Sequence, residues 1–296
     1  MAVLSSNVRV RLLVLLLGAL LIAPLSAKEP WFFAVMSDPQ FGMYAKDQNF
    51  TQETANFEFA IANANRLHPK FVVVTGDLVN RHGDAQQIAE YKRLVQTFDP
   101  GIHVYSVPGN HDVGNLPTPE TIKAYRKAIG PDYYTFKTDE ILGVVLNSSL
   151  IRSPEADPQD AKKQEEWLVK VLQQAKSDTQ REIVVFQHIP YFLKSADEED
   201  QYFNIPQAAR RKYLDLLEAA GVRYVYAGHL HHNAIAKDGQ LTETVTGAVG
   251  MPLGGSLSGF RVVIADGDRL NSTWFCMGGI PNQIDPQKTP TTPCPQ

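Results

Sequence analysis

The feature that most constrains this chain is a series of short apolar runs, each followed by polar residues of the kind that bind metals. Amphipathic stretches of helical length separate these runs. In the first half, strands are expected at Trp31–Ser37, Phe71–Thr75, His103–Val107 and Ile141–Leu146, and helices at Thr51–Leu67, Ala85–Phe98 and Pro119–Ile129. This alternation is typical of α/β proteins with parallel strands.

The second half repeats the alternation and then changes character. Helices are expected at Gln159–Lys176 and Gln207–Ala220, and strands at Glu182–Phe186, Val222–Ala227, Leu241–Thr246, Arg261–Ala265 and Arg269–Phe275. Two strand–helix halves followed by a β meander predict one α/β domain. We expect a four-layer αββα sandwich, in which two mixed β-sheets pack face to face with helices outside.

The ends of the chain differ from this domain, which we place at residues 28–277. Arg9 and Arg11 precede an apolar run of about 14 residues, which is shorter than the roughly 20 needed to cross a bilayer. We therefore interpret residues 1–27 as a secretory signal peptide and expect a secreted or periplasmic protein. A retained membrane anchor is the alternative, and residues 278–296 are predicted to be a Pro-rich, loosely held tail.

Charge and cysteine content exclude several classes of protein. A formal net charge of -4 argues against a nucleic-acid scaffold, which needs clustered cations to neutralise phosphates. Cys276 and Cys294 are the only cysteines, and the sequence leaves open whether they pair. Two cysteines cannot build a Cys-rich zinc site, so any bound metal must be held by Asp, Asn, Gln and His.

Five expected strands end in side chains that ligate metals or move protons. These candidates are Asp38, Gln40, Asp77, Asn110, His111, Asp112, His188, His229 and His231. Open α/β sheets bring the carboxyl ends of their strands to one edge, so the candidates are expected to converge. Burying so many ionisable groups together is costly unless cations hold them, which favours a pair of metal ions.

The individual motifs differ in specificity. Asp38-Pro39-Gln40 alone is a common turn, and Asp77 alone could cap a helix. Three reactive side chains in a row at Asn110–Asp112 have no packing purpose and point to chemistry. His229 and His231 are expected on an extended segment, where alternate residues point the same way toward neighbouring ions. The acidic, aromatic segment Ser195–Asn204 is expected to form a loop over the site.

With these motifs together, residues 31–265 resemble the calcineurin-like metallophosphoesterases. The resemblance is strongest to the type called calcineurin-like phosphoesterase domain-containing protein 1, through Asp38–Gly42, Gly109–Asn115 and Phe186–Pro190. It implies two divalent metal ions, with manganese, iron and zinc as candidates. The implied ligands are Asp38, Gln40, Asp77 and His231 for the first ion, and Asp77, Asn110, His188 and His229 for the second.

The same resemblance implies a reaction. Phosphate monoesters would be hydrolysed by attack of a metal-bound hydroxide. His111 would face the substrate as a catalytic residue, and Asp112 would orient its ring. Position 40 departs from most of the family, which has His there, and an amide oxygen suits manganese or iron better than an ion that seeks imidazole.

The expected substrate is a phosphorylated small molecule or a phosphoprotein. The resembled type suggests phosphoserine or phosphothreonine, although export would separate the enzyme from cytoplasmic phosphoproteins. The alternatives are a phosphodiesterase or nucleotide hydrolase of the same fold, and a non-catalytic phosphoesterase-like scaffold. We expect a monomer that has no stable membrane span once the signal is removed.

Overall fold

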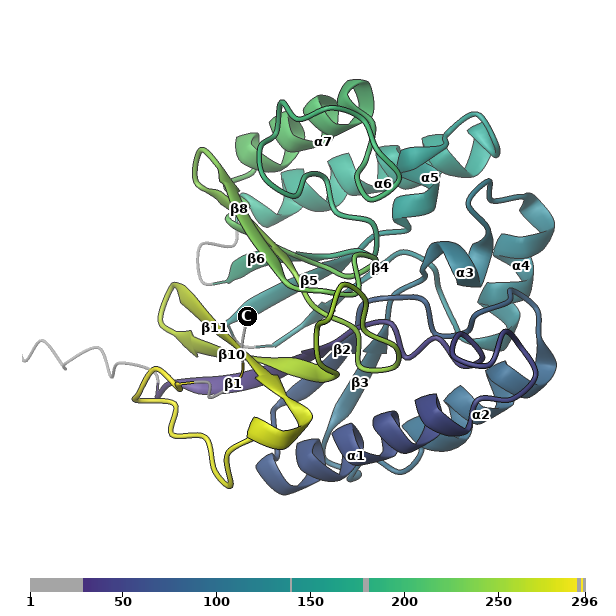
Figure 1. The fold of residues 1–296 in the computed structure, drawn as a ribbon. Coiled ribbons are helices and arrows are strands. Elements are labelled where there is room, and N and C mark those ends of the chain that lie inside the picture. Colours follow the sequence, from purple (N-terminus) through teal and green to yellow (C-terminus); the bar gives the residue numbers. More distant parts are fainter. Residues whose placement is uncertain (1–28, 139, 178–180, 292–293, 295–296) are drawn as a thin grey trace, which may run out of the picture.

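Two β-sheets stack face to face at the centre of the molecule (Figure 1), and the computed structural model describes residues 29–138, 140–177, 181–291 and 294. The first sheet has the order β11 (Arg269–Cys276), β10 (Gly259–Asp266), β1 (Trp31–Met36), β2 (Phe71–Val74) and β3 (His103–Ser106). Strands β1, β2 and β3 are parallel, whereas β10 is antiparallel to both β1 and β11. The predicted signal segment at residues 1–27 lies outside the described residues.

The second sheet is also mixed. Its order is β4 (Tyr134–Lys137), β5 (Ile141–Val145), β6 (Glu182–Phe186), β7 (Tyr224–Ala227), β9 (Leu241–Val245) and β8 (Ala234–Asp238). Strands β5, β6, β7 and β9 are parallel, and the edge strands β4 and β8 are antiparallel to their neighbours. The predicted pair of mixed sheets is therefore confirmed.

Helices cover the outer face of each sheet and complete the four layers (Figure 1). Helices α1 (Thr51–Leu67) and α2 (Ala85–Val95) cover the first sheet, and α6 (Pro158–Ala175) and α7 (Gln207–Ala219) cover the second. The remaining helices are α3 (Asn110–Val113), α4 (Pro119–Ala128), α5 (Ser148–Arg152) and the 3₁₀ turn η1 (Met277–Gly279). Among the described residues, no helix combines the length and apolar character needed to cross a bilayer.

Local sequence signals explain where helices α2 and α6 begin. The side chain of Asp84 accepts hydrogen bonds from the backbone N–H groups of Gln86 and Gln87, which caps α2. Asp157 caps α6 in the same way, and Pro158 follows at the first helical position, where its missing N–H costs nothing.

Strand β1 shows how the layers are separated. Phe33 and Val35 point between the two sheets, while Ala34 and Met36 point toward α1 and α2. Both faces are buried, so the strand is apolar throughout rather than alternating with polar residues. Phe33 stacks on Phe71 of the neighbouring strand β2 with ring centroids 4.7 Å apart, and both rings belong to the core between the sheets.

The sequence pattern predicted one β meander at the end of the domain. The last four strands do not form one. Strands β8 and β9 form a hairpin on the second sheet, whereas β10 and β11 cross back to the first. Strand β10 pairs with β1, with Trp31 opposite Ala265. Alternating hydrophobicity identifies a strand but carries no information on which distant strand it pairs with. Strands β4 and β8 were not predicted as separate strands.

The C-terminal segment, which was expected to be loosely held, contacts the domain at several points. Arg66 of α1 donates hydrogen bonds to the carbonyl oxygens of Pro281, at 2.9 Å, and Asn282, at 2.6 Å. A disulfide joins Cys276 at the end of β11 to Cys294. The pairing that the sequence left open therefore ties the tail to the first sheet.

Removing this disulfide is expected to destabilise the domain. A variant carrying Cys276→Ala and Cys294→Ala should lose about 2–4 kcal/mol of the free energy of unfolding, because the unfolded chain is no longer constrained by the closed loop. Urea denaturation measures the loss. Dithiothreitol should lower the stability of the wild type by a similar amount and leave the variant unchanged. Equal stability of oxidised wild type and variant contradicts the prediction.

Candidate metal centre

The predicted ligands converge where the carboxyl ends of strands from both sheets meet. Asp38 and Gln40 follow β1, Asp77 follows β2 and Asn110 begins the helical turn after β3, while His188 follows β6 and both His229 and His231 follow β7. All seven side chains are buried. The site therefore lies on the junction between the sheets, with ligands supplied by both.

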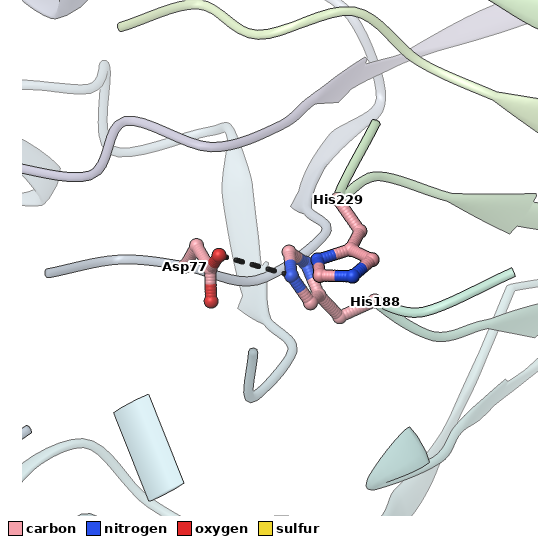
Figure 2. Close-up of side chains that lie close together, drawn as sticks. All are labelled: Asp77, His188 and His229. Atoms are coloured by element: carbon pink, nitrogen blue, oxygen red, sulfur yellow. Dashed lines mark ion pairs between the residues drawn. The ribbon is translucent and has the colours of Figure 1, made fainter. Parts of the chain in front are cut away.

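Two groups of side chains have the geometry to hold a cation. One consists of Asp77, His188 and His229, and the other of Asp38, Asp77 and His231; within each group the ligand atoms lie within 4.8 Å of one another. Asp77 belongs to both. Figure 2 shows the first group, with the ring of His188 directed at the carboxylate of Asp77 and the ring of His229 beside it. Two cations that share one carboxylate fit this arrangement.

Backbone carbonyl groups hold each histidine ring in place. Nδ1 of His188 lies 2.8 Å from the carbonyl oxygen of Thr75, and its Nε2 faces Oδ2 of Asp77 at 3.1 Å. His231 has the same arrangement, with Nδ1 on the carbonyl of Met251 and Nε2 facing Oδ1 of Asp38 at 3.3 Å. A carbonyl oxygen can only accept a hydrogen bond. The ring nitrogen held by the carbonyl therefore carries a proton, and the other ring nitrogen of the neutral imidazole can bind a cation.

His229 is held the other way round. Its Nε2 lies 3.1 Å from the backbone oxygen of Tyr202, which leaves Nδ1 for a cation. The amide of Asn110 is also oriented, because its nitrogen donates to the hydroxyl of Tyr202 at 3.3 Å while its oxygen lies 3.0 Å from Nε2 of His188. Asn110 therefore presents its oxygen to the site, as a ligand must.

Gln40 fits a cation as well. It is 1% exposed, and its Oε1 has no hydrogen-bond partner among the described residues, while its Nε2 donates to Oδ1 of Asn80 at 3.1 Å. Its backbone N–H donates to the backbone carbonyl of Asp77 at 2.8 Å, which places residue 40 beside the loop that carries the shared carboxylate. A buried acceptor without a donor is costly, and a cation would remove that cost.

The site stores backbone strain. Within the described part of the chain, eight non-glycine residues have a positive φ, and five of them are candidate ligands: Asp38, Gln40, Asp77, His229 and His231. This left-handed conformation is unfavourable for residues with a Cβ and clusters at functional sites. His229 and His231 therefore lie on a tight turn, and the prediction that they share an extended segment was wrong.

Glycines beside the ligands allow the loops to approach closely. A Cβ at position 109 would lie 2.1 Å from Oδ1 of Asp77, and one at position 228 would lie 1.9 Å from the hydroxyl oxygen of Ser37. Gly109 and Gly228 are required for space, since any side chain would separate the loops that bring the ligands together.

His111 lies at the edge of the ligand groups and is half-buried. Its backbone N–H donates to Oδ1 of Asp77 at 2.8 Å, and its ring Nδ1 lies 2.6 Å from the backbone oxygen of Asn80. The ring is therefore fixed, with Nε2 as its remaining functional nitrogen.

Asp112 does not orient this ring, contrary to the prediction. Its carboxylate accepts hydrogen bonds from the backbone N–H groups of Leu78, Val79 and Gly109 at 2.7–3.2 Å. Residues 110–113 form a helical turn rather than an extended loop, so neighbouring side chains point in different directions. Asp112 ties the loop after β2 to the loop after β3. The ring of His111 is oriented by the backbone oxygen of Asn80, the role that had been predicted for Asp112.

The ionisable side chains of the centre shift one another's pKa values. Burial alone would lower the pKa of His188, but the opposite charge of Asp77 and its hydrogen bond outweigh burial and raise that pKa to about 9. The reverse effect holds the pKa of Asp77 below its usual range in spite of burial. Burial and the neighbouring charge of His188 lower the pKa of His229 to about 4. At neutral pH the second proton of His188 thus occupies a position that a cation would take.

The sequence predicted a loop over the site at Ser195–Asn204, and Tyr202-Phe203-Asn204 is part of the family resemblance, but no role was assigned to Tyr202. The ring of Tyr202 lies 4.9 Å from the ring of His229, and Tyr202 also holds Asn110. Nothing in the spacing of the acidic loop marks this tyrosine. Its role depends on where the loop folds.

Comparisons with known proteins agree with this geometry. The sequence model of the calcineurin-like phosphoesterase family matches residues 33–233, and the chain belongs to that family, whose members depend on two metal ions. It is 35% identical over 265 residues to the serine/threonine-protein phosphatase CPPED1 of Bos taurus, covering 84% of this chain and 85% of the relative. The Danio rerio CPPED1 is 36% identical over 250 residues, covering 79% and 81%.

A solved structure shows the same fold at low sequence identity. The dimetal phosphatase from Danio rerio LOC 393393 superposes with a TM-score of 0.64 and 16% identity, covering 83% of this chain and 96% of that one. The fold and family predicted from the sequence are therefore confirmed, and the protein is a phosphatase.

Metal binding is expected to release protons at neutral pH. His188 has a pKa of about 9 and so carries a proton at pH 7, whereas a ligating imidazole must be neutral. Affinity for Mn²⁺ should therefore rise as the pH increases toward that pKa and level off above it. Calorimetric titration in buffers of different ionisation enthalpy counts the protons. No release at pH 7 and an affinity that does not change with pH contradict the prediction.

Proposed function

We propose that this phosphatase hydrolyses phosphate monoesters, and phosphoserine or phosphothreonine esters in particular, at a centre of two metal ions. The observation that carries the proposal is that one buried carboxylate, Asp77, belongs to both ligand groups. When bound, the ions supply Lewis acidity, which polarises the phosphate and lowers the pKa of water. The side chains of the chain then fix the ions, the substrate and the proton.

The structure supports a division of roles among these side chains. Asp38, Gln40, Asp77 and His231 would hold the first ion, and Asp77, Asn110, His188 and His229 the second. His111 is the substrate-facing residue. With its Nδ1 held by a backbone carbonyl, its Nε2 can stabilise the phosphoryl group or protonate the leaving oxygen.

Manganese or iron is the proposed occupant of the first site. That site offers two carboxylates and an amide oxygen beside a single imidazole, and oxygen-rich sets suit these ions. The second site, with two imidazoles, accommodates zinc equally well. Metal analysis of protein purified without chelator tests the assignment.

The substrate class is supported by the relatives. Both CPPED1 proteins are named as serine/threonine-protein phosphatases, which favours a phosphorylated protein over a small phosphomonoester. A phosphodiester remains the competing substrate within the family, and comparison of esters decides between them.

We also propose that the enzyme acts outside the cytoplasm. The basic start and apolar run of residues 1–27 support export. The disulfide between Cys276 and Cys294 supports it independently, because disulfides persist in oxidising compartments. Amino-terminal sequencing of the protein recovered from its host tests the proposal; a first residue near Lys28 is expected.

Substitutions at the centre should separate metal binding from catalysis. Asp77→Asn should lose bound metal, because the shared ligand loses its charge. His111→Ala should keep the metal and lose about 10²–10⁴-fold in kcat, the usual contribution of a positioned proton donor. Metal content and turnover are measured on the same samples. Equal activity in wild type and both variants would indicate a contaminating phosphatase.

A comparison of esters should identify the substrate class. Hydrolysis of a phosphothreonine peptide and of p-nitrophenyl phosphate is expected to exceed hydrolysis of bis(p-nitrophenyl) phosphate, with the peptide giving the higher kcat/KM. Preference for the bis-ester would assign a phosphodiesterase. Absence of turnover with every ester and added Mn²⁺ would leave a scaffold role.

A further inference from the structure

Gln40 poses a problem of orientation that the other candidate ligands of its group do not. A carboxylate presents oxygen at both of its terminal atoms, whereas an amide presents oxygen at one and NH₂ at the other. Only the oxygen can bind a cation. The usefulness of Gln40 therefore depends on what fixes the direction of its amide.

A chain of hydrogen bonds fixes that direction. Nε2 of Gln40 donates to Oδ1 of Asn80 at 3.1 Å, and Nδ2 of Asn80 donates to Oδ1 of Asp47 at 2.8 Å. The carboxylate oxygen of Asp47 accepts hydrogen bonds, so it requires the NH₂ end of Asn80. The oxygen of Asn80 must then face Gln40, and Gln40 must turn its own NH₂ toward Asn80. Its oxygen is left for the metal group.

A second amide confirms the polarity at Asp47. Nε2 of Gln87 donates to the same Oδ1 of Asp47 at 2.7 Å. The oxygen of Gln87 accepts from the backbone N–H groups of Asn80, at 3.0 Å, and Arg81, at 2.9 Å. Backbone N–H groups cannot reverse their role, so the direction of the Gln87 amide is determined independently.

The local backbone is shaped to place Asp47 at this point. Asp47 has a φ of 64°, and its N–H donates to the carbonyl of Gly42 at 2.8 Å. A Cβ on Gly42 would lie 2.8 Å from Oδ1 of Asp47 and 2.6 Å from Nε2 of Gln87. A glycine at position 42 therefore leaves the space in which the carboxylate and the amide meet.

We propose that Asp47 is a positioning residue that commits the oxygen of Gln40 to the first metal site, acting through Asn80. The carboxylate of Asp47 lies at the surface, outside the metal groups. It sets the direction of the amide of Asn80 and, through it, the direction of the amide of Gln40. The inference rests on the proposed two-metal function. The backbone oxygen of the same Asn80 holds the ring of His111. The hydrogen-bond relay from Asp47 through Asn80 to Gln40 therefore joins the first site to the substrate-facing histidine.

A double-mutant cycle on Asp47 and Gln40 tests the proposal. Asp47→Ala removes the oxygen that accepts from the NH₂ group of Asn80, so the direction of the relay is no longer imposed. Gln40→Glu provides a ligand with two equivalent oxygens, which needs no orientation. The two changes should therefore be strongly non-additive if orientation is the role of Asp47.

The readout is the binding of Mn²⁺ followed by calorimetry on the full chain. Asp47→Ala is expected to weaken one of the two binding events at least tenfold and leave the other within twofold. In the Gln40→Glu background, the same substitution should change affinity less than twofold or strengthen binding, because Asn80 can then turn its NH₂ toward Glu. Asp99→Ala, at a surface carboxylate outside the relay, is the matched control and should leave both events unchanged.

The outcomes separate the two proposals. If the wild type binds no Mn²⁺, the two-metal function fails. If the wild type binds two ions and Asp47→Ala binds them equally well, the positioning role alone is overturned. It is also overturned if Asp47→Ala weakens binding by the same factor in both backgrounds, since a merely structural role predicts that result. Thermal unfolding of each variant verifies that the proteins compared are folded.

Discussion

The buried carboxylate of Asp77 is the constraint on which the rest of the site depends. It is 1% exposed, pairs with His188, accepts the backbone N–H of His111 and belongs to both metal groups. A charge removed from water in this way is costly unless cations surround it. No single strand can supply enough partners, so strands of two sheets must end at the same point. The face-to-face packing of the sheets therefore serves the chemistry as well as the core.

The division between rigid strands and strained loops follows from the same requirement. Strands β1 and β2 are held by apolar packing on both faces, which fixes their ends. The ligands follow immediately in left-handed backbone, and Gly109 and Gly228 let the loops pass within contact distance. Strain at the ligands is tolerated because the sheets on either side are well packed. Preorganisation of this kind reduces the cost of assembling a metal site.

Hydrogen-bond direction is a second theme of the centre. Hydrogen bonds to backbone carbonyls determine which ring nitrogen carries the proton in His188, His229 and His231. The hydroxyl of Tyr202 orients the amide of Asn110 directly. The carboxylate of Asp47 orients the amide of Asn80, which in turn orients the amide of Gln40. A neutral amide can stand in for a histidine only if something outside the site determines which of its ends faces inward. Fold alone does not assign a function, but this pattern of donors and acceptors does.

The sequence by itself determined the class of the fold and indicated the candidate ligands. Helix α1 was predicted with its observed bounds, and the seven candidate ligands were proposed because each comes after an apolar strand, a signal that is local. Tertiary structure alone decided that β10 pairs with β1, that Asp112 binds backbone rather than His111, and that Tyr202 and Asp47 orient amides. These features join residues far apart along the chain. Periodicity and spacing describe neighbours in sequence, whereas partners and hydrogen-bond directions are fixed only when distant loops meet.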